Sequence, residues 1–299
     1  MPSNHQPPLT LMAVFAHPDD EAFGIGGTMA RYGADPEVRV VLVCATRGEA
    51  GEISDPKLAT PERLGEVREQ ELRCACGLFG VDALHFLGYR DSGMAGTPEN
   101  SDPRALALAN AQEVVGRIAA LIRSECPDVV VTHDETGGYG HPDHIAVHHH
   151  TTAAFAAAGD PACYPELTCG EHGESIAAGL EPHRPAKLYY TAIPRRYFRA
   201  VVAKLEELGM PVPERLLQRR DAPWGLPDEA CTTDVPVVDY WDRKRAGIEC
   251  HATQLKPGSF FSVLPPEVVR ELQTYECFQL AESSVGGDEG SHDLFAGLR

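Results

Sequence analysis

Two short segments of this chain place histidine and carboxylate side chains at close spacing. They are AHPDDE at 16–21 and GHPDH at 140–144. His17 and Asp20 lie three positions apart, so one turn of backbone can aim both at a single ion, and His144 can supply a third ligand. Two nitrogen ligands and one oxygen ligand, with a fourth position left for water, are typical of a catalytic zinc site. The sequence therefore predicts one Zn²⁺ per chain, and Fe²⁺ or Co²⁺ fits the same donor set.

Further side chains beside these predicted ligands suit the hydrolysis of a carbonyl compound. Asp19 is not needed as a ligand, and a free carboxylate beside a metal can take a proton from water. His141, protonated and oriented by Asp143, can stabilise an oxyanion, and Tyr139 can reach the same oxygen. We therefore predict a metal-dependent hydrolase. The simpler alternative is that these acids and histidines only cap helices and stabilise loops, but it does not account for two His-Pro-Asp turns.

Three consecutive histidines follow the second segment. His144 and His148 are four positions apart on a predicted helix, which is a spacing that metal sites use. Because three ligands are already assigned, we expect His148 to support the site from behind or to be a hydrogen-bonded core residue. His149 and His150 are expected to be exposed.

Composition and charge exclude several classes of partner. The 299 residues include 26 Lys and Arg against 44 Asp and Glu, a net charge of −18, which argues against nucleic-acid binding. A glycine-rich stretch at 24–27 resembles a dinucleotide loop, but the pattern fails and the preceding acids would repel a pyrophosphate. A small-molecule substrate is therefore the expected partner, and a homo-oligomer remains open.

The cysteines and the apolar runs bear on the compartment. The nine cysteines are odd in number and scattered, which is typical of free thiols in a reducing cytoplasm. No apolar run is long enough for a membrane span or a signal segment. We expect a cytoplasmic protein without membrane attachment.

Apolar runs and helical periodicity alternate along the first two thirds of the chain. Strands are predicted at 10–16, 38–45, 83–87, 128–132 and 187–193. Helices are predicted at 26–32, 61–79, 103–124 and 144–158. This alternation predicts an α/β fold, a Rossmann-like three-layer sandwich with a mostly parallel central sheet.

The predicted strands would gather the chemistry at one edge of that sheet. His17, the segment 46–51, Asp91 and His141 each follow a different strand. Ligands of open parallel sheets bind beyond the carboxyl ends of the strands. The pattern loosens after residue 195, where helices are expected at 240–252 and 265–273. We divide the chain into a catalytic core, 8–194, and a smaller C-terminal portion, 195–299, that caps the active site.

The two histidine segments and several further motifs resemble the LmbE/PIG-L family of zinc-dependent amino-sugar de-N-acetylases. The layout is especially similar to its mycothiol-pathway members. The further matches span nearly the whole chain and are TRGE at 46–49, Arg68 with Glu69, RDSGM at 90–94 and HATQ at 251–254.

The resemblance implies a role for each matching residue. It implies His17, Asp20 and His144 as zinc ligands. Asp19 would be the general base and later the acid to the leaving amine. The oxyanion would be stabilised by His141, with Asp143 orienting it and Tyr139 helping. Contacts to the sugar are implied for four further residues, namely Glu49, Arg68, Asp91 and His251.

The resemblance specifies the type of reaction more closely than it specifies the substrate. It implies removal of an N-acetyl, or more generally N-acyl, group from a 2-amino-sugar or its conjugate. Gly24 departs from the larger or polar residues that mycothiol-type enzymes carry there, and the segments 159–186 and 209–235 are individual to this chain. Alternatives are therefore an amidase that cuts a larger sugar-amide conjugate, a natural-product deacylase, or an accessory protein that binds a sugar conjugate without cleaving it.

Overall fold

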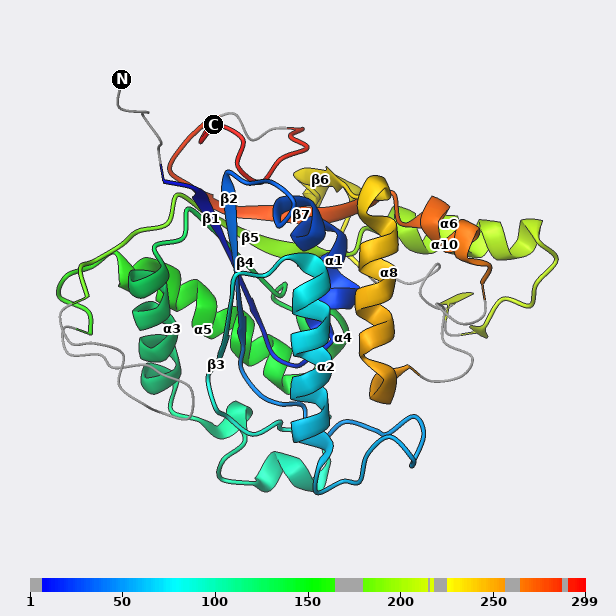
Figure 1. The fold of residues 1–299 in the computed structure, drawn as a ribbon, viewed down its shortest axis with the longest axis horizontal. Coiled ribbons are helices and arrows are strands. Elements are labelled where there is room, and N and C mark those ends of the chain that lie inside the picture. Colours follow the sequence, from blue (N-terminus) through cyan, green and yellow to red (C-terminus); the bar gives the residue numbers. More distant parts are fainter. Residues whose placement is uncertain (1–6, 165–179, 215, 218–224, 256–263, 287–289) are drawn as a thin grey trace.

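A single mixed sheet forms the centre of the molecule (Figure 1). The computed structural model describes residues 7–164, 180–214, 216–217, 225–255, 264–286 and 290–299. Within these residues the sheet has seven strands in the order β3-β2-β1-β4-β5-β7-β6. The strands are β1 (Leu9–Phe15), β2 (Val38–Cys44), β3 (Ala83–Phe86), β4 (Val129–Thr132), β5 (Lys187–Ala192), β6 (Thr233–Pro236) and β7 (Tyr275–Ser283).

The first five strands are parallel, and their sequences explain why they lie in the middle. β1 and β2 are almost continuous apolar runs, and nearly every residue in them is buried, as expected for strands covered on both faces. The remaining parallel pairs are β1 with β4, β2 with β3, and β4 with β5. These five strands confirm the strands predicted from the apolar runs.

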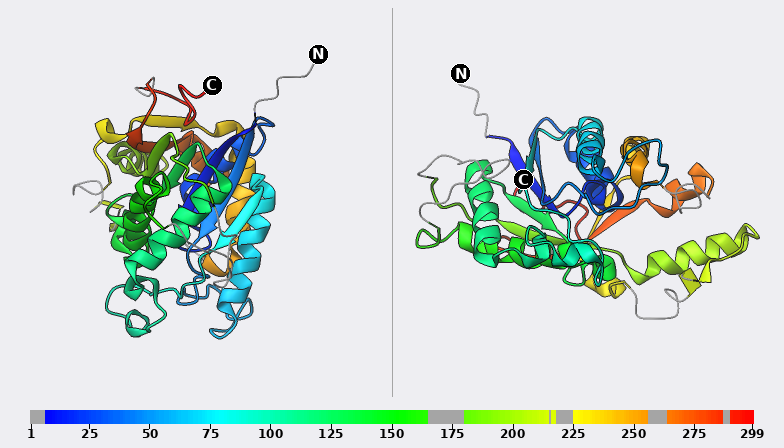
Figure 2. Two further views of the ribbon diagram at one scale, coloured as in Figure 1. Left: turned by 90° about the vertical axis from the view of Figure 1, so that its left-hand side faces the viewer. Right: turned by 90° about the horizontal axis from the view of Figure 1, so that it is seen from below.

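Helices cover both faces of the sheet and complete the predicted three layers (Figure 2). One face packs against α1 (Asp20–Tyr32), α2 (Leu64–Phe79) and α8 (Trp241–Cys250). The other face packs against α3 (Ala111–Glu125) and α5 (Pro142–Ala158), while α4 (Gly137–Gly140) is a single turn before α5. α6 (Arg195–Glu207) and α10 (Pro266–Leu272) contact each other beside β7 and enclose a third apolar cluster.

Two helices begin far from the predicted residues, whereas α2 and α5 begin within three residues of them. α1 begins at Asp20 rather than residue 26 and carries non-helical backbone at Ile25. α3 begins at Ala111 rather than residue 103, because the side chain of Asn110 accepts hydrogen bonds from the backbone N–H groups of the first turn. The preceding residues form two short 3-10 turns, Pro98–Ser101 and Leu106–Leu108.

The C-terminal part of the chain adds strands as well as helices. β7 pairs antiparallel with β5 and with β6, so the sheet continues past the division proposed at residue 194. Neither β6 nor β7 is predicted from the sequence, and α6 is likewise new. The predicted helices at 240–252 and 265–273 correspond to α8 and α10.

A disulfide between Cys74 and Cys250 corrects the expectation that all cysteines are free thiols. It joins α2 to the end of α8 across 176 residues, with the two Cα atoms 6.0 Å apart. The helices approach closely because residue 247 is glycine: a Cβ there would lie 2.1 Å from Cζ of Phe79. Among the described cysteines, the other six are free.

No helix in the described parts of the chain is both long enough and apolar enough to cross a membrane.

Candidate metal centre

The candidate site lies at the point where the order of the strands reverses. The chain runs outward from β1 through β2 to β3, then returns to the other side of β1 with β4. The crevice beyond the carboxyl ends of such neighbouring strands is where open α/β sheets bind ligands. His17 lies two residues after β1, and His133 directly follows β4. The first turn of α5 carries His144 into the same crevice.

The three predicted metal ligands converge there. His17 Nδ1 lies 3.1 Å from His144 Nε2, and Asp20 Oδ1 lies 3.1 Å from the same nitrogen. The third side of this triangle of side chains runs from His17 Nδ1 to the other carboxylate oxygen of Asp20, Oδ2, at 3.5 Å. Ligands about 2.0–2.1 Å from a tetrahedral ion stand roughly 3.3 Å apart. Distances of this size are compatible with a bound metal ion. Among the described residues, the groups that could hold one divide the predicted ligands: His17 and His144 group with His141, whereas Asp20 and His144 group with His133.

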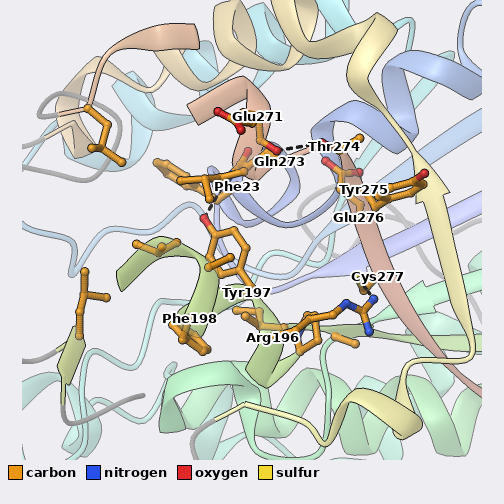
Figure 3. A pocket seen from close by; sticks show the side chains of 18 of the residues that line it. Phe23, Arg196, Tyr197, Phe198, Glu271, Gln273, Thr274, Tyr275, Glu276 and Cys277 are labelled. Carbon is orange, nitrogen blue, oxygen red and sulfur yellow. Dashed lines mark hydrogen bonds between the residues drawn. The ribbon is translucent and has the colours of Figure 1, made fainter. Parts of the chain in front are cut away.

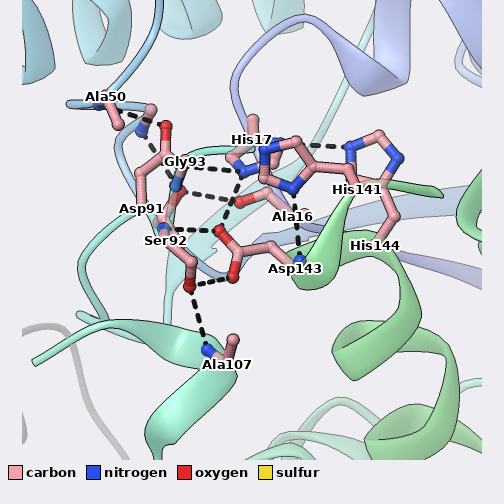
Figure 4. A network of polar contacts seen from close by, with 12 residues as sticks. Ala16, His17, Ala50, Asp91, Ser92, Gly93, Ala107, His141, Asp143 and His144 are labelled. Carbon is pink, nitrogen blue, oxygen red and sulfur yellow. Dashed lines mark hydrogen bonds and ion pairs between the residues drawn. The ribbon is translucent and has the colours of Figure 1, made fainter. Parts of the chain in front are cut away.

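Other hydrogen bonds turn the ligand atoms toward one another (Figure 4). His144 Nδ1 lies 3.1 Å from the carbonyl oxygen of Gly137, which leaves Nε2 for a metal. His17 Nε2 lies 3.1 Å from Asp143 Oδ2 and 3.5 Å from Asp91 Oδ1. Partners of this kind fix the tautomer and the orientation of a metal-binding imidazole.

Asp143 differs from its predicted role. Its carboxylate contacts His17, and it accepts hydrogen bonds from the backbone N–H of Ser92, at 2.9 Å, and from the Ser92 hydroxyl. The bond to His141 comes instead from the backbone N–H of Asp143, which donates to His141 Nδ1 at 3.2 Å. The fully buried Asp143 carboxylate thus orients a proposed metal ligand, not the proposed oxyanion stabiliser.

His141 is the N-cap residue of α5, and its environment favours the neutral imidazole. Burial, together with the charges of His17 and His144, lowers the pKa of His141 to about 4. Because Nδ1 accepts the bond from the backbone of Asp143, the proton of the neutral ring lies on Nε2. The residue can therefore donate a hydrogen bond without the protonation that the sequence-based prediction assumed.

Asp19 has an unusual backbone conformation, with φ 115° and ψ −28°. Non-glycine residues rarely adopt such angles, which cost roughly 1–3 kcal/mol and cluster at functional sites. Arg68 Nη2 lies 3.1 Å from Asp19 Oδ2. Burial raises the pKa of Asp19 to about 6, although the Arg68 charge opposes this. A carboxyl group with a raised pKa suits a group that takes up and gives back a proton near neutrality.

His133 is a member of the cluster that the sequence analysis missed. Its ring stacks on His144, with the centroids 4.1 Å apart, and its Nε2 lies 3.5 Å from Asp20 Oδ2. The backbone N–H of Ala16 donates to that same nitrogen at 3.3 Å, so His133 is already engaged as an acceptor. Burial lowers its pKa to about 4, which fits a neutral acceptor. Its position directly after the fourth predicted strand was the available signal.

The predicted sugar-binding residues lie beside the cluster, but most of them already form hydrogen bonds within the protein. Arg68 is buried and donates to the carbonyl oxygens of Gly48, at 2.8 Å, and of Pro18. Gly48 has φ +66°, and a Cβ there would lie 2.1 Å from Arg68 Nη1.

Glu49 and Asp91 lie together on the two neighbouring loops. The backbone N–H of Asp91 donates to Glu49 Oε2 at 3.1 Å, and the Asp91 carboxylate accepts bonds from the backbone of Gly93 and Ala50. His251 is fully buried, which does not fit the predicted contact with a substrate. It pairs with Glu21 instead, with 2.7 Å between Nε2 and Oε1.

The histidines that follow the second segment behave largely as expected. His148 is buried, and its Nδ1 lies 2.9 Å from the carbonyl oxygen of His133. His149 is exposed, whereas His150 is half-buried.

Tyr139 lies beside the cluster and also lines a pocket. Figure 3 shows this pocket, with Phe23 and Tyr197 among its lining side chains. The ring centroid of Tyr139 lies 5.0 Å from that of His144, and the side chain is 53% exposed. The pocket has a volume of about 860 Å³ and is also bordered by Phe23 and Gly24 of α1. Its far walls come from α6, α10 and β7, and most of their side chains are apolar or aromatic. Parts of the individual segments predicted to shape the pocket, 165–179, 215 and 218–224, lie outside the described residues.

Two solved structures share this fold over most of the chain. An N,N'-diacetylchitobiose deacetylase from Pyrococcus horikoshii matches with a TM-score of 0.61 and 20% identity, covering 91% of this chain and 83% of that one. A 4-carboxy-2-hydroxymuconate hydratase from Pseudomonas putida KT2440 matches with a TM-score of 0.56 and 20% identity, covering 93% and 98%. Because one is a deacetylase and the other a hydratase, the fold alone does not fix the reaction.

Relatives in sequence are more specific. Residues 12–155 match the PIG-L family, described as GlcNAc-PI de-N-acetylase. A 1D-myo-inositol 2-acetamido-2-deoxy-alpha-D-glucopyranoside deacetylase from Thermobifida fusca (strain YX) is 39% identical over 298 residues, covering 96% of this chain and 98% of the relative. A protein of the same name from Geodermatophilus obscurus is 39% identical over 303 residues, covering 98% and 99%. With this similarity running from end to end, the chain belongs to the PIG-L family of de-N-acetylases.

Proposed function

We propose that this protein is a metal-dependent hydrolase that removes the N-acetyl group from a 2-amino-sugar conjugate. The observation that carries the proposal is the triangle of His17, Asp20 and His144 donor atoms, with the carboxylate of Asp19 beside it and outside the ligand set. The relatives named as deacetylases of an N-acetylglucosamine-inositol conjugate support the substrate class.

The ligand set suits one Zn²⁺, held by His17, Asp20 and His144, and Fe²⁺ or Co²⁺ fits the same donors. When bound, such an ion lowers the pKa of a water molecule toward neutrality and polarises a carbonyl oxygen. Elemental analysis of the purified protein identifies the metal.

The remaining steps fall to side chains of the chain itself. Asp19 takes the proton from the attacking water and returns it to the nitrogen of the leaving amine. Arg68 holds the carboxylate of Asp19 in place from behind. His141 donates from Nε2 to the carbonyl oxygen as negative charge develops there, a role for which a neutral imidazole is sufficient. Tyr139, which is exposed and lines the pocket, is proposed to help at the same oxygen.

Glu49 and Asp91 are proposed to face the sugar ring. Both carboxylates lie on loops at the carboxyl ends of β2 and β3, next to the metal triangle. Carboxylate oxygens are hydrogen-bond acceptors, and sugar hydroxyls are donors.

The pocket favours a second candidate within the same reaction class. A volume of about 860 Å³ and a mostly apolar wall suit a bulky group, either on the acyl side of the amide or in the aglycone of the sugar. An amidase that cleaves a larger sugar-amide conjugate, or a deacylase of a natural product, would use this space.

A substrate panel separates these functions. The purified, zinc-loaded protein is assayed for free amine on N-acetylglucosamine conjugates with different aglycones and on matched amides with longer acyl chains, scored as kcat/KM. Release of acetate from the acetylated sugars supports the first function, and a preference for long acyl chains supports the second. Binding of the conjugates without any release would identify an accessory protein. Asp19→Asn serves as the inactive control in every assay.

We also propose a compartment and a class of partner for the enzyme. We propose that it acts in the cytoplasm on a small molecule, with neither nucleic acid nor membrane as partner. The Cys74–Cys250 disulfide is the observation that opposes a reducing compartment. Cell fractionation together with thiol labelling of the freshly isolated protein tests both points, and light scattering gives its oligomeric state.

A further inference from the structure

A buried pair of side chains lies directly behind the proposed general base. Glu21 and His251 are 1% and 0% exposed, and His251 Nε2 lies 2.7 Å from Glu21 Oε1. The second oxygen, Glu21 Oε2, accepts a hydrogen bond from the backbone N–H of Asp19 at 2.9 Å. One carboxylate therefore links the end of α8 to the backbone of Asp19. The catalytic steps proposed above use neither Glu21 nor His251.

The backbone of Asp19 needs such support. Its φ of 115° is unfavourable for a residue with a side chain, and its carbonyl oxygen accepts from the N–H groups of Ala22 and Phe23, at 3.0 Å each, in the first turn of α1. The carbonyl bonds tie Asp19 to the helix. The bond from its N–H to Glu21, together with the bond from Arg68 to the carbonyl oxygen of Pro18, holds the preceding peptide and opposes rotation of φ back to negative values. That rotation would turn the side chain away from its present direction.

His251 fixes Glu21 in turn. His251 caps the end of α8, and the loop that follows is anchored separately by Glu71, whose carboxylate accepts from Thr253 N at 2.8 Å and Thr253 Oγ1 at 2.7 Å. Glu71 is buried like Glu21, and its carboxylate binds the loop that follows His251, but among the described residues it forms no hydrogen bond with Asp19. The chain thus offers a matched pair of buried glutamates, one of which touches the proposed base.

We propose that Glu21 and His251 are positioning residues for catalysis, which hold the backbone of Asp19 so that its carboxylate faces the metal triangle. This inference rests on the proposed function, because it assigns Asp19 as the base. Without this role, the buried pair of Glu21 and His251 would serve only to join α1 to α8.

The Glu21→Gln variant distinguishes a role of Glu21 in positioning Asp19 from a role in packing alone. The Asp19 N–H needs an acceptor, and His251 Nε2 also faces an oxygen of Glu21. A glutamine side chain has the same shape but only one oxygen, so it can accept from one neighbour and must present an N–H group to the other. The Glu71→Gln variant removes one acceptor from the same loop and serves as the control.

The experiment compares Glu21→Gln, His251→Gln and Glu71→Gln with the parent enzyme for kcat, KM, bound zinc and thermal midpoint. We expect Glu21→Gln and His251→Gln to lose about 10- to 100-fold in kcat, with KM and zinc content nearly unchanged. Glu71→Gln is expected to lower the thermal midpoint while keeping its kcat within about twofold. A crystal structure of Glu21→Gln is expected to show φ of Asp19 moved away from 115°.

The inference is overturned if Glu21→Gln keeps both its kcat and the φ of Asp19, or if kcat of all three variants falls in step with their thermal midpoints. Should Glu21→Gln fail to fold, His251→Gln leaves Glu21 in place and decides the matter by the same measurements. Failure of the proposed function is a separate result, because then the parent enzyme itself releases no amine from any substrate of the panel.

Discussion

His17 Nδ1 and His144 Nε2 lie 3.1 Å apart, although 127 residues separate the two histidines in the chain. A hydrogen bond at the other ring nitrogen orients each imidazole. The partner of His17 is the Asp143 carboxylate, and the partner of His144 is the carbonyl oxygen of Gly137. The lone pairs of His17 Nδ1 and His144 Nε2 then face each other. This arrangement is favourable only if a cation or a single shared proton lies between the two nitrogens. This pair is therefore the most direct place to test the metal assignment.

Replacing His144 by alanine is expected to remove the metal. Loss of one of three protein ligands leaves two donors, and zinc content after dialysis against a weak chelator should fall from about one ion per chain to nearly none. The His149→Ala variant is the control, because this exposed histidine lies on the same helix. The measurement is inductively coupled plasma mass spectrometry. Full zinc content in His144→Ala would refute the assigned ligand set.

Asp143→Asn tests the support behind His17. The Asp143 carboxylate is fully buried and lies 3.1 Å from His17 Nε2, so its loss weakens the orientation of the ligand rather than removing it. We expect zinc affinity to fall by about 10- to 100-fold in competition with a chromophoric chelator. Asp82→Asn, which alters a carboxylate bonded to the backbone of Val40 far from the site, should leave the affinity unchanged. Equal affinities for the two variants would contradict the assigned role of Asp143.

Reduction of the Cys74–Cys250 bond is expected to destabilise the protein. The bond closes a loop across 176 residues, and cross-links of this kind restrict the unfolded chain. The free energy of unfolding, measured with urea, should drop by about 2–5 kcal/mol when dithiothreitol is added. The same reagent should not affect the double variant Cys74→Ser/Cys250→Ser. A reductant effect of equal size in that variant would place its cause elsewhere.

Glu125 should make part of the stability depend on pH. A hydrogen bond from His85, at 2.8 Å, and the guanidinium of Arg39 hold the pKa of Glu125 below its ordinary value of 4.5. Since the folded state has the lower pKa, this stabilisation is complete above about pH 4.5 and is lost as the pH falls through the folded-state value. The difference in unfolding free energy between the parent and Glu125→Gln should shrink as the pH falls from about 4.5 toward 3. A difference that grows on acidification would reverse the assigned direction.

The parallel half of the sheet was predictable because its residues carry strong local signals. β1 and β2 are apolar along almost their whole length, and a strand that is buried on both faces needs no partner information to be recognised. The site followed from the same signals, since His17 and His144 stand at the ends of recognisable elements.

Residues whose roles depend on distant contacts were not predictable. β7 alternates buried and partly exposed positions at its start and becomes a strand only by pairing with β5 and β6. His251 matches a family motif, but only the packing of α8 on α1 shows that it is sealed against Glu21 and away from solvent. The Cys74–Cys250 pair likewise depends on the approach of two helices whose spacing the chain does not encode locally.

The pocket and the bond-cleaving groups come from different stretches of the polypeptide. All proposed ligands and proton-transferring side chains precede residue 145, whereas the pocket wall beyond Phe23, Gly24 and Tyr139 is drawn from residues 192–277. Substitutions of these pocket residues can therefore redirect which molecules are accepted while the reaction itself is preserved. An enzyme built in this way can acquire new specificities through changes in a few late residues, provided that His251 and the early catalytic residues are kept.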